Sequence, residues 1–137
     1  MIEVQNLTKT FGCNIAVDNI SFSISKGEVV GFLGPNGAGK TTTMRMLTGF
    51  LKPSGGRAKI AGIDVNEQPF EVRQKIGYLP ENVPLYKEMD VESYLGFFAR
   101  IKGADESNIN EIMEKTAIGS VRKRLIGKLS KGFQQRV

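Results

Sequence analysis

Residues 34–42 (Gly-Pro-Asn-Gly-Ala-Gly-Lys-Thr-Thr) combine glycines, a lysine and hydroxyl groups in a spacing that suits phosphate binding. Glycine tolerates backbone angles closed to other residues, so consecutive N–H groups can turn inward and form a concave anion site. Lys40 would reach the β- and γ-phosphates of a nucleotide, and the Thr41 hydroxyl would be a ligand of Mg²⁺. We predict that a nucleoside triphosphate is bound by Gly34, Pro35, Asn36, Gly37, Ala38, Gly39, Lys40, Thr41 and Thr42.

The flanks of this loop have the types that a phosphate loop needs. Residues 28–33 are an apolar run short enough for a buried strand, and residues 42–48 have the composition of a helix. The alternative is a glycine-rich turn without a ligand. Kinases, GTPases, helicases and transport ATPases share the motif, so the motif alone predicts a nucleotide and no particular reaction.

The elements around the loop fall into two regions, which we place at residues 1–80 and 81–137. In the first region, residues 2–7 and 20–25 alternate apolar and polar side chains, which predicts half-buried antiparallel strands. Further elements are expected as a strand at 57–62, a brief helix at 70–75 and a buried strand at 76–79 that stops at Pro80.

Beyond Pro80 the apolar residues take a helical period. Asp90 suits an N-cap and Gly103 a C-terminal stop, and between them an apolar stripe contains Val91, Tyr94, Leu95 and Phe98. A second stripe is formed by Ile109, Ile112, Met113 and Thr116, with Gly119 as its expected stop. Both stripes are interpreted as core.

Charge and composition limit the function classes. The 137 residues carry a net charge of +5, and the stretch from Lys115 onward has seven basic residues and no acid. Such a block could face nucleic acid, anionic lipid or phosphate; our preferred interpretation is a solvated surface whose acidic counterparts lie outside this sequence. Without histidine there is no histidine base, and Cys13 alone cannot form an internal disulfide. We expect a cytosolic chain, because no long apolar segment or secretion signal occurs.

The segment at residues 129–136 (Leu-Ser-Lys-Gly-Phe-Gln-Gln-Arg) resembles the signature motif of ABC ATPases. Phe11 stands where that family has its adenine-stacking aromatic residue, and residues 76–81 resemble the segment leading into its Q-loop. The likeness spans essentially the whole chain and is greatest to the bacterial drug-export and gliding-motility branch.

The resemblance implies an α/β phosphate-loop NTPase fold of the ABC ATPase type. Its parts would be an antiparallel β subdomain, an incomplete parallel-sheet core and the start of a helical subdomain. It implies an ATPase with ATP and Mg²⁺ as cofactors, in which Lys40 and Glu81 are catalytic and Thr41 and Glu81 hold the metal. Ser130 and Gly132 would contact the γ-phosphate of an ATP held by a second subunit.

Three positions depart from the family's pattern. Lys131 replaces a glycine of the signature, Phe133 replaces its glutamine, and Glu81 replaces the Q-loop glutamine. A carboxylate at position 81 can still be a ligand of Mg²⁺, and it adds negative charge near the γ-phosphate.

In the family, the acidic Walker B strand and the catalytic glutamate come after the signature. The resemblance therefore implies that the 137 residues are a truncated portion, which binds nucleotide without hydrolysing it and is marginally stable alone. Expected partners are a second nucleotide-binding subunit and an integral-membrane permease contacted through residues 81–105, at the inner face of the cell membrane. No nucleic acid is expected. The alternatives are a soluble ABC ATPase acting on ribosomes or DNA and a non-catalytic nucleotide-binding remnant.

Overall fold

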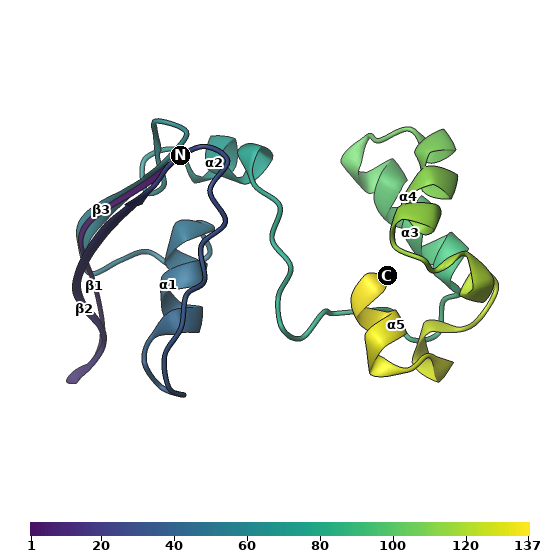
Figure 1. Cartoon of the computed structure of the whole chain (residues 1–137), viewed down its shortest axis with the longest axis horizontal. Coiled ribbons are helices and arrows are strands. Elements are labelled where there is room, and N and C mark those ends of the chain that lie inside the picture. The colour runs from purple at the N-terminus through teal and green to yellow at the C-terminus, as the bar shows by residue number, and fades with distance from the viewer. The chain divides into compact units, whose positions relative to one another are not determined.

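The computed structural model describes residues 1–137 and divides them into two compact units (Figure 1). The first unit is Met1–Tyr78 and the second is Leu79–Val137. Each unit has its own hydrophobic core. No helix in the chain combines the length and the apolar character that a membrane span requires.

The first unit contains a four-stranded sheet. Its strands are β1 (Ile2–Phe11), β2 (Asn14–Ile24), β3 (Gly55–Ile60) and β4 (Ile63–Asp64), in the order β2-β1-β3-β4. Every pairing is antiparallel, which confirms the expected antiparallel sheet. β1 and β2 are longer than their alternating patterns predicted, because the strands continue to the tight turn at Gly12, where φ is 56°.

Two helices accompany this sheet. They are α1 (Lys40–Leu47), which follows the glycine-rich loop, and α2 (Pro69–Lys75). The core forms where the apolar side of the sheet meets these helices, and its buried members are Val4, Leu7, Val17, Met46, Leu47, Ala58, Ile60, Val65 and Val72. This packing fixes α1 against the sheet and thereby places the loop that precedes it.

The strands expected at residues 28–33 and 76–79 do not form, so the prediction of a parallel-sheet core is wrong for these residues. Val29 is fully exposed and Leu33 is 93% exposed. A parallel strand needs neighbours that take up its backbone hydrogen bonds and cover both of its faces. None of the four strands pairs with either segment, and an apolar run without such a partner stays irregular.

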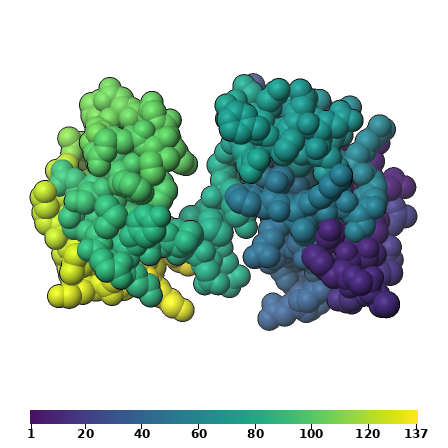
Figure 2. All heavy atoms as spheres, turned by 180° about the vertical axis from the view of Figure 1, so that it is seen from behind, coloured from purple at the N-terminus to yellow at the C-terminus, as the bar shows by residue number.

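The second unit is helical. Its elements are α3 (Val91–Lys102), η1 (Glu106–Asn108), α4 (Ile109–Lys115), η2 (Gly119–Val121), η3 (Ile126–Lys128) and α5 (Lys131–Arg136). In Figure 2 the region of α3 and α4, in green, lies directly against the C-terminal segment, in yellow. The buried core contains Val91, Tyr94, Ile109, Met113, Ile118, Val121, Ile126 and Leu129.

The predicted boundaries of α3 are confirmed. Asp90 caps the helix by accepting a hydrogen bond from the Ser93 N–H at 2.9 Å, and Gly103 ends it with φ at 64°. The second stripe is only partly buried, since Ile112 is 47% exposed. Its helix also ends earlier than expected, at Lys115, where the chain turns through a left-handed Ala117 before it reaches Gly119.

Candidate functional site

The glycine-rich loop is exposed at residues 34–38 and leads through the half-buried Gly39 into α1. The first backbone N–H of this helix to find a backbone partner is that of Thr43, which donates to the Gly39 carbonyl at 2.8 Å. The N–H groups of Lys40, Thr41 and Thr42 make no hydrogen bond, and no side chain caps the helix. Free N–H groups and the positive end of the helix dipole together attract an anion.

Lys40 folds back over the loop. Its ammonium group donates to the carbonyl oxygens of Gly34 and Pro35, both at 2.7 Å. An ammonium has three donors, so one remains for a further acceptor. The positive charge is therefore held beside the free N–H groups at the start of α1.

Gly39 packs closely against β2 and so holds the loop next to the sheet. Its φ is 84°, and a β-carbon at this position would lie 2.3 Å from the Ala16 carbonyl oxygen and 3.0 Å from a methyl group of Val17. Gly37 also has a positive φ, of 85°, but a β-carbon there would meet nothing. The two glycines thus differ: both permit the turn, and only Gly39 is also required by close contact with β2.

Phe11 ends β1 in the same unit as the loop, and its side chain is 50% exposed. An exposed aromatic ring near the surface is available for stacking on a planar group. One face of this ring is already occupied, because the ammonium group of Lys9 lies over it.

The signature segment lies in the second unit. Ser130 is the N-cap of α5, and its hydroxyl accepts a 3.4 Å hydrogen bond from the Phe133 N–H. Gly132 is exposed in the first turn of this short helix. The side chain of Phe133 packs against the core of the second unit, which explains why an apolar residue is tolerated there.

The polar contacts of this segment are made by the neighbouring residue. The Gln134 amide donates to the carbonyl oxygens of Ile126 and Leu129, at 3.0 and 3.2 Å. Gln134 and Gln135 are equivalent in the sequence pattern, because only the fold decides which of them faces the turn.

Thr41 belongs to the first unit and Glu81 to the second, and both are exposed. The chain has no group of three or more carboxylate, cysteine or histidine side chains that could hold a metal ion.

The basic residues near the C-terminus are partly paired within the chain, contrary to expectation. Glu92 forms ion pairs with Arg122 at 3.1 Å and with Lys123 at 2.5 Å, and Lys115 pairs with Glu111 at 2.6 Å. The hydrogen bond from Lys123 is the main reason that the pKa of Glu92 is lowered. The interpretation that the acidic counterparts lie outside this sequence is wrong for these three basic residues.

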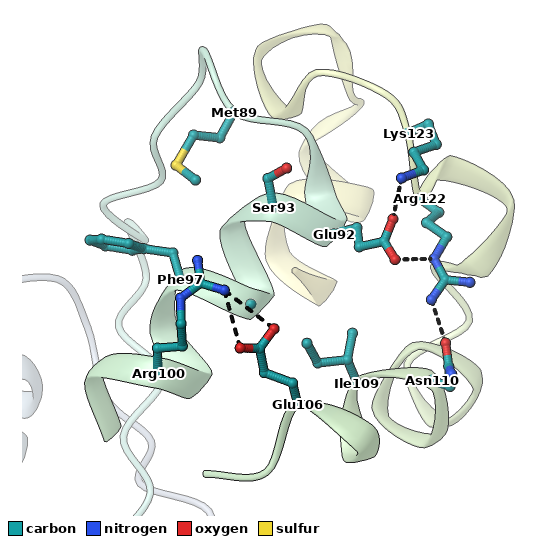
Figure 3. A pocket seen from close by; sticks show the side chains of 11 residues that line it. Met89, Glu92, Ser93, Phe97, Arg100, Glu106, Ile109, Asn110, Arg122 and Lys123 are labelled. Carbon is teal, nitrogen blue, oxygen red and sulfur yellow. Dashed lines mark hydrogen bonds and ion pairs between the residues drawn. The ribbon is translucent and has the colours of Figure 1, made fainter. Parts of the chain in front are cut away.

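These ion pairs line a cavity of about 480 Å³ between α3, α4 and the segment around Arg122 (Figure 3). A second pair, between Arg100 and Glu106 at 3.1 Å, crosses another side of it. Arg122 also donates to the side chain of Asn110. The charged groups of the cavity thus pair with one another as ions, and their arrangement indicates a structural role.

The exposed glycine loop, the lysine folded over it and the free N–H groups of α1 are typical of the phosphate-loop class of nucleotide-binding proteins. Comparison with known proteins specifies the family. Residues 17–137 match the sequence profile of the family described as ABC transporter. This chain belongs to that family.

Individual relatives agree with this assignment. The chain is 38% identical over 141 residues to the probable multidrug ABC transporter ATP-binding protein YbhF of Escherichia coli K12, covering 100% of this chain and 24% of that protein. It is 36% identical over 138 residues to the bacitracin transport ATP-binding protein BcrA of Bacillus licheniformis, covering 100% of this chain and 45% of that protein.

Solved structures extend the match to the fold. One described as the ATP binding subunit of an ABC transporter superposes with a TM-score of 0.83 at 26% identity, over 99% of this chain and 58% of that one. The chain therefore has the ABC ATPase fold, and the family resemblance stated from its motifs is confirmed. It spans about a quarter of YbhF and under half of BcrA.

Proposed function

We propose that this chain binds Mg²⁺–ATP at residues 34–42 and forms part of the ATPase subunit of an ABC transporter. The observation that carries this proposal is the set of free N–H groups at Lys40, Thr41 and Thr42, beside a lysine ammonium and a loop shaped by glycine. These donors suit an anion of several charges, and the exposed loop leaves room for it.

In this proposal the Lys40 ammonium changes its hydrogen-bond acceptors when the nucleotide binds. Its ammonium now donates to two neutral carbonyls of the loop. A contact between the ammonium and an ionised phosphate adds the attraction of two opposite charges to the hydrogen bond, so a triphosphate can replace these neutral carbonyls as the acceptor. The lysine would then lie on the β- and γ-phosphates while the helix N–H groups hold the rest of the chain of phosphates.

The residues present fit a magnesium ion that arrives with the nucleotide. Thr41 offers a hydroxyl and Glu81 a carboxylate, which are hard oxygen ligands of the kind Mg²⁺ prefers. The ion would neutralise charge on the β- and γ-phosphates.

The remaining residues complete the proposed site. Phe11 would stack on the adenine, while Ser130 and Gly132 would contact the γ-phosphate of an ATP held by a second copy. Ser130 already caps α5, so the hydroxyl stands at the free end of that helix. Residues 81–105 would meet a membrane permease, and the subunit would be peripheral on the inner face of the cell membrane. The names of YbhF and BcrA, both of which refer to transport, support this assignment.

The nucleotide site is tested by Lys40→Ala in the product of the complete gene. Isothermal titration with Mg²⁺–ATP should show affinity at least tenfold weaker, because a charge-assisted contact to phosphate is lost. Lys59→Ala is the control. Lys59 lies on β3, where it is the cross-strand neighbour of Glu3 near the start of β1. Unchanged ATP affinity or ATP turnover in Lys40→Ala would refute the assignment of the site.

The partner is tested by purification from membranes. Co-purification with a polytopic membrane protein is expected, and it should be lost when the membrane fraction is omitted. Purification with ribosomes or DNA instead would support the soluble alternative.

A further inference from the structure

The end of β1 presents a lysine and an aromatic ring as a pair. The Nζ atom of Lys9 lies 5.1 Å from the centroid of the Phe11 ring, which is within the range of a cation–π interaction. Phe11 remains 50% exposed. With the ammonium over one face, the exposed part of the ring is free to meet another planar group.

Lys9 is itself held in place. Its ammonium donates to the carbonyl oxygen of Lys52 at 2.7 Å. Lys52 follows the turn that ends α1, where the N–H groups of Phe50 and Leu51 both donate to the Arg45 carbonyl. The lysine therefore joins the aromatic ring to the helix whose other end carries the phosphate loop.

A second set of hydrogen bonds fixes the same turn to β1. The Ser54 N–H donates to the Thr8 carbonyl at 2.9 Å, and the Ser54 hydroxyl accepts from the Thr10 N–H at 3.1 Å. Thr8 and Thr10 flank Lys9 in the strand. The backbone on both sides of Lys9 is thus tied to the turn after α1, which keeps the Lys52 carbonyl within reach of the lysine ammonium.

We propose that Lys9 is a positioning residue for the nucleobase: it holds the Phe11 ring with one face open to stacking, at a fixed place relative to the phosphate loop. This inference rests on the proposed function, in which Phe11 stacks on the base of the bound nucleotide. Because every base has a π-face, such a platform senses that a base is present and not which base it is. The Lys9 ammonium donates to the Lys52 carbonyl and forms no hydrogen bond with the loop, so the proposed role concerns the base and not the phosphates.

The test distinguishes an effect on binding of the base from an effect on binding of the phosphates. In the product of the complete gene, Lys9→Met keeps most of the side-chain length and removes the charge. Isothermal titration with Mg²⁺–ATP and Mg²⁺–GTP should show affinities about two- to five-fold weaker for both, the range expected from an exposed cation–π contact. Affinity for magnesium tripolyphosphate, which has no base, should be unchanged. Lys9→Arg keeps a cation over the ring and should restore nucleotide affinity.

Two further variants make the result specific. Lys59→Met removes the same charge from the same sheet away from the ring, and it should leave all three affinities unchanged. In the Phe11→Ala background, Lys9→Met should weaken ATP binding no further, because a double-mutant cycle isolates the pair.

The outcomes distinguish this inference from the function on which it rests. If the unmodified protein fails to bind Mg²⁺–ATP, the proposed function itself is wrong. If it binds ATP and Lys9→Met weakens tripolyphosphate as much as ATP, or weakens neither, the positioning role of Lys9 is overturned and the phosphate loop stands.

Discussion

Gly127 donates its backbone N–H to the carbonyl oxygen of Lys87 at 3.0 Å, and Ile126 donates to Met89 beside it at 2.9 Å. These bonds join the segment that leads into the signature to the segment that leads into α3. A β-carbon on Gly127 would lie 3.0 Å from that same Lys87 oxygen and 3.1 Å from the Lys87 β-carbon. A side chain at residue 127 would therefore press on the backbone of Lys87.

We predict that Gly127→Ala destabilises the second unit by about 1 kcal/mol, since an added methyl group in a well-packed place forces backbone shifts. Hydrogen–deuterium exchange by mass spectrometry should show faster exchange at residues 124–127. The matched variant is Gly119→Ala, where a β-carbon meets nothing and φ is not positive. Equal exchange in both variants would contradict the proposed steric role of Gly127.

The N-cap of α3 predicts a dependence on pH. The Ser93 backbone N–H, and then the Ser93 hydroxyl, hold the pKa of Asp90 below its ordinary value of 3.8. A carboxyl whose folded-state pKa lies below its unfolded-state value contributes stability above the unfolded pKa, and this contribution is lost as the pH falls through the folded pKa.

Asp90→Ala should therefore lower the free energy of unfolding by about 1 kcal/mol at pH 7. The difference from the unmodified protein should shrink as the pH falls below about 4. Asp90→Asn keeps an N-cap acceptor that does not titrate, so it should stay near the unmodified stability at pH 7. Urea denaturation between pH 7 and pH 3 measures this. A constant difference between Asp90→Ala and the unmodified protein over that range would refute the explanation.

Local patterns in the sequence were sufficient for elements whose causes lie within a few residues. The cap at Asp90 and the stop at Gly103 were predictable, because each acts through its own turn of helix. The antiparallel strands were predictable from alternation of polar and apolar residues. The helix after the phosphate loop was likewise expected, and the structure places it at Lys40–Leu47.

The errors arose where a segment depends on distant partners. An apolar run at 28–33 matches a buried strand in composition, but strand formation needs a neighbour in space, and no strand of this sheet pairs with it. The pairing of Arg122 and Lys123 with Glu92 was missed for the same reason, since charge counts say nothing of which side chains meet. The sequence pattern did not indicate a role for Lys9, because a lysine two residues before an aromatic residue is a common arrangement.

The phosphate loop yields a prediction from two glycines that look equivalent in the motif. Both have φ near 85°, so alanine at either position incurs the cost of a left-handed backbone, about 1–2 kcal/mol. Gly39→Ala would in addition place a methyl group 2.3 Å from the Ala16 oxygen, which β2 cannot relieve without moving. We expect Gly39→Ala to lower the melting temperature clearly more than Gly37→Ala does. Equal losses, measured by circular dichroism, would show that contact with β2 is unimportant.

The signature segment gives the last prediction, from two adjacent glutamines. Gln134 is partly buried and bonds two carbonyls, whereas Gln135 is exposed. Truncating Gln134 to alanine leaves the Leu129 carbonyl without a donor, while the Ile126 carbonyl keeps its bond from the Leu129 N–H. Leaving such a group unsatisfied costs about 1–3 kcal/mol when it is buried. Gln134→Ala should therefore destabilise the protein by about 1 kcal/mol in urea, at the lower end of that range because the site is only partly buried. Gln135→Ala should change the stability by less than about 0.5 kcal/mol, as is usual for surface positions.

If the two variants lose the same stability, the Gln134 amide does not hold the turn before Ser130. A loss confined to Gln134→Ala would instead mean that the position of the Ser130 cap depends on the Gln134 amide.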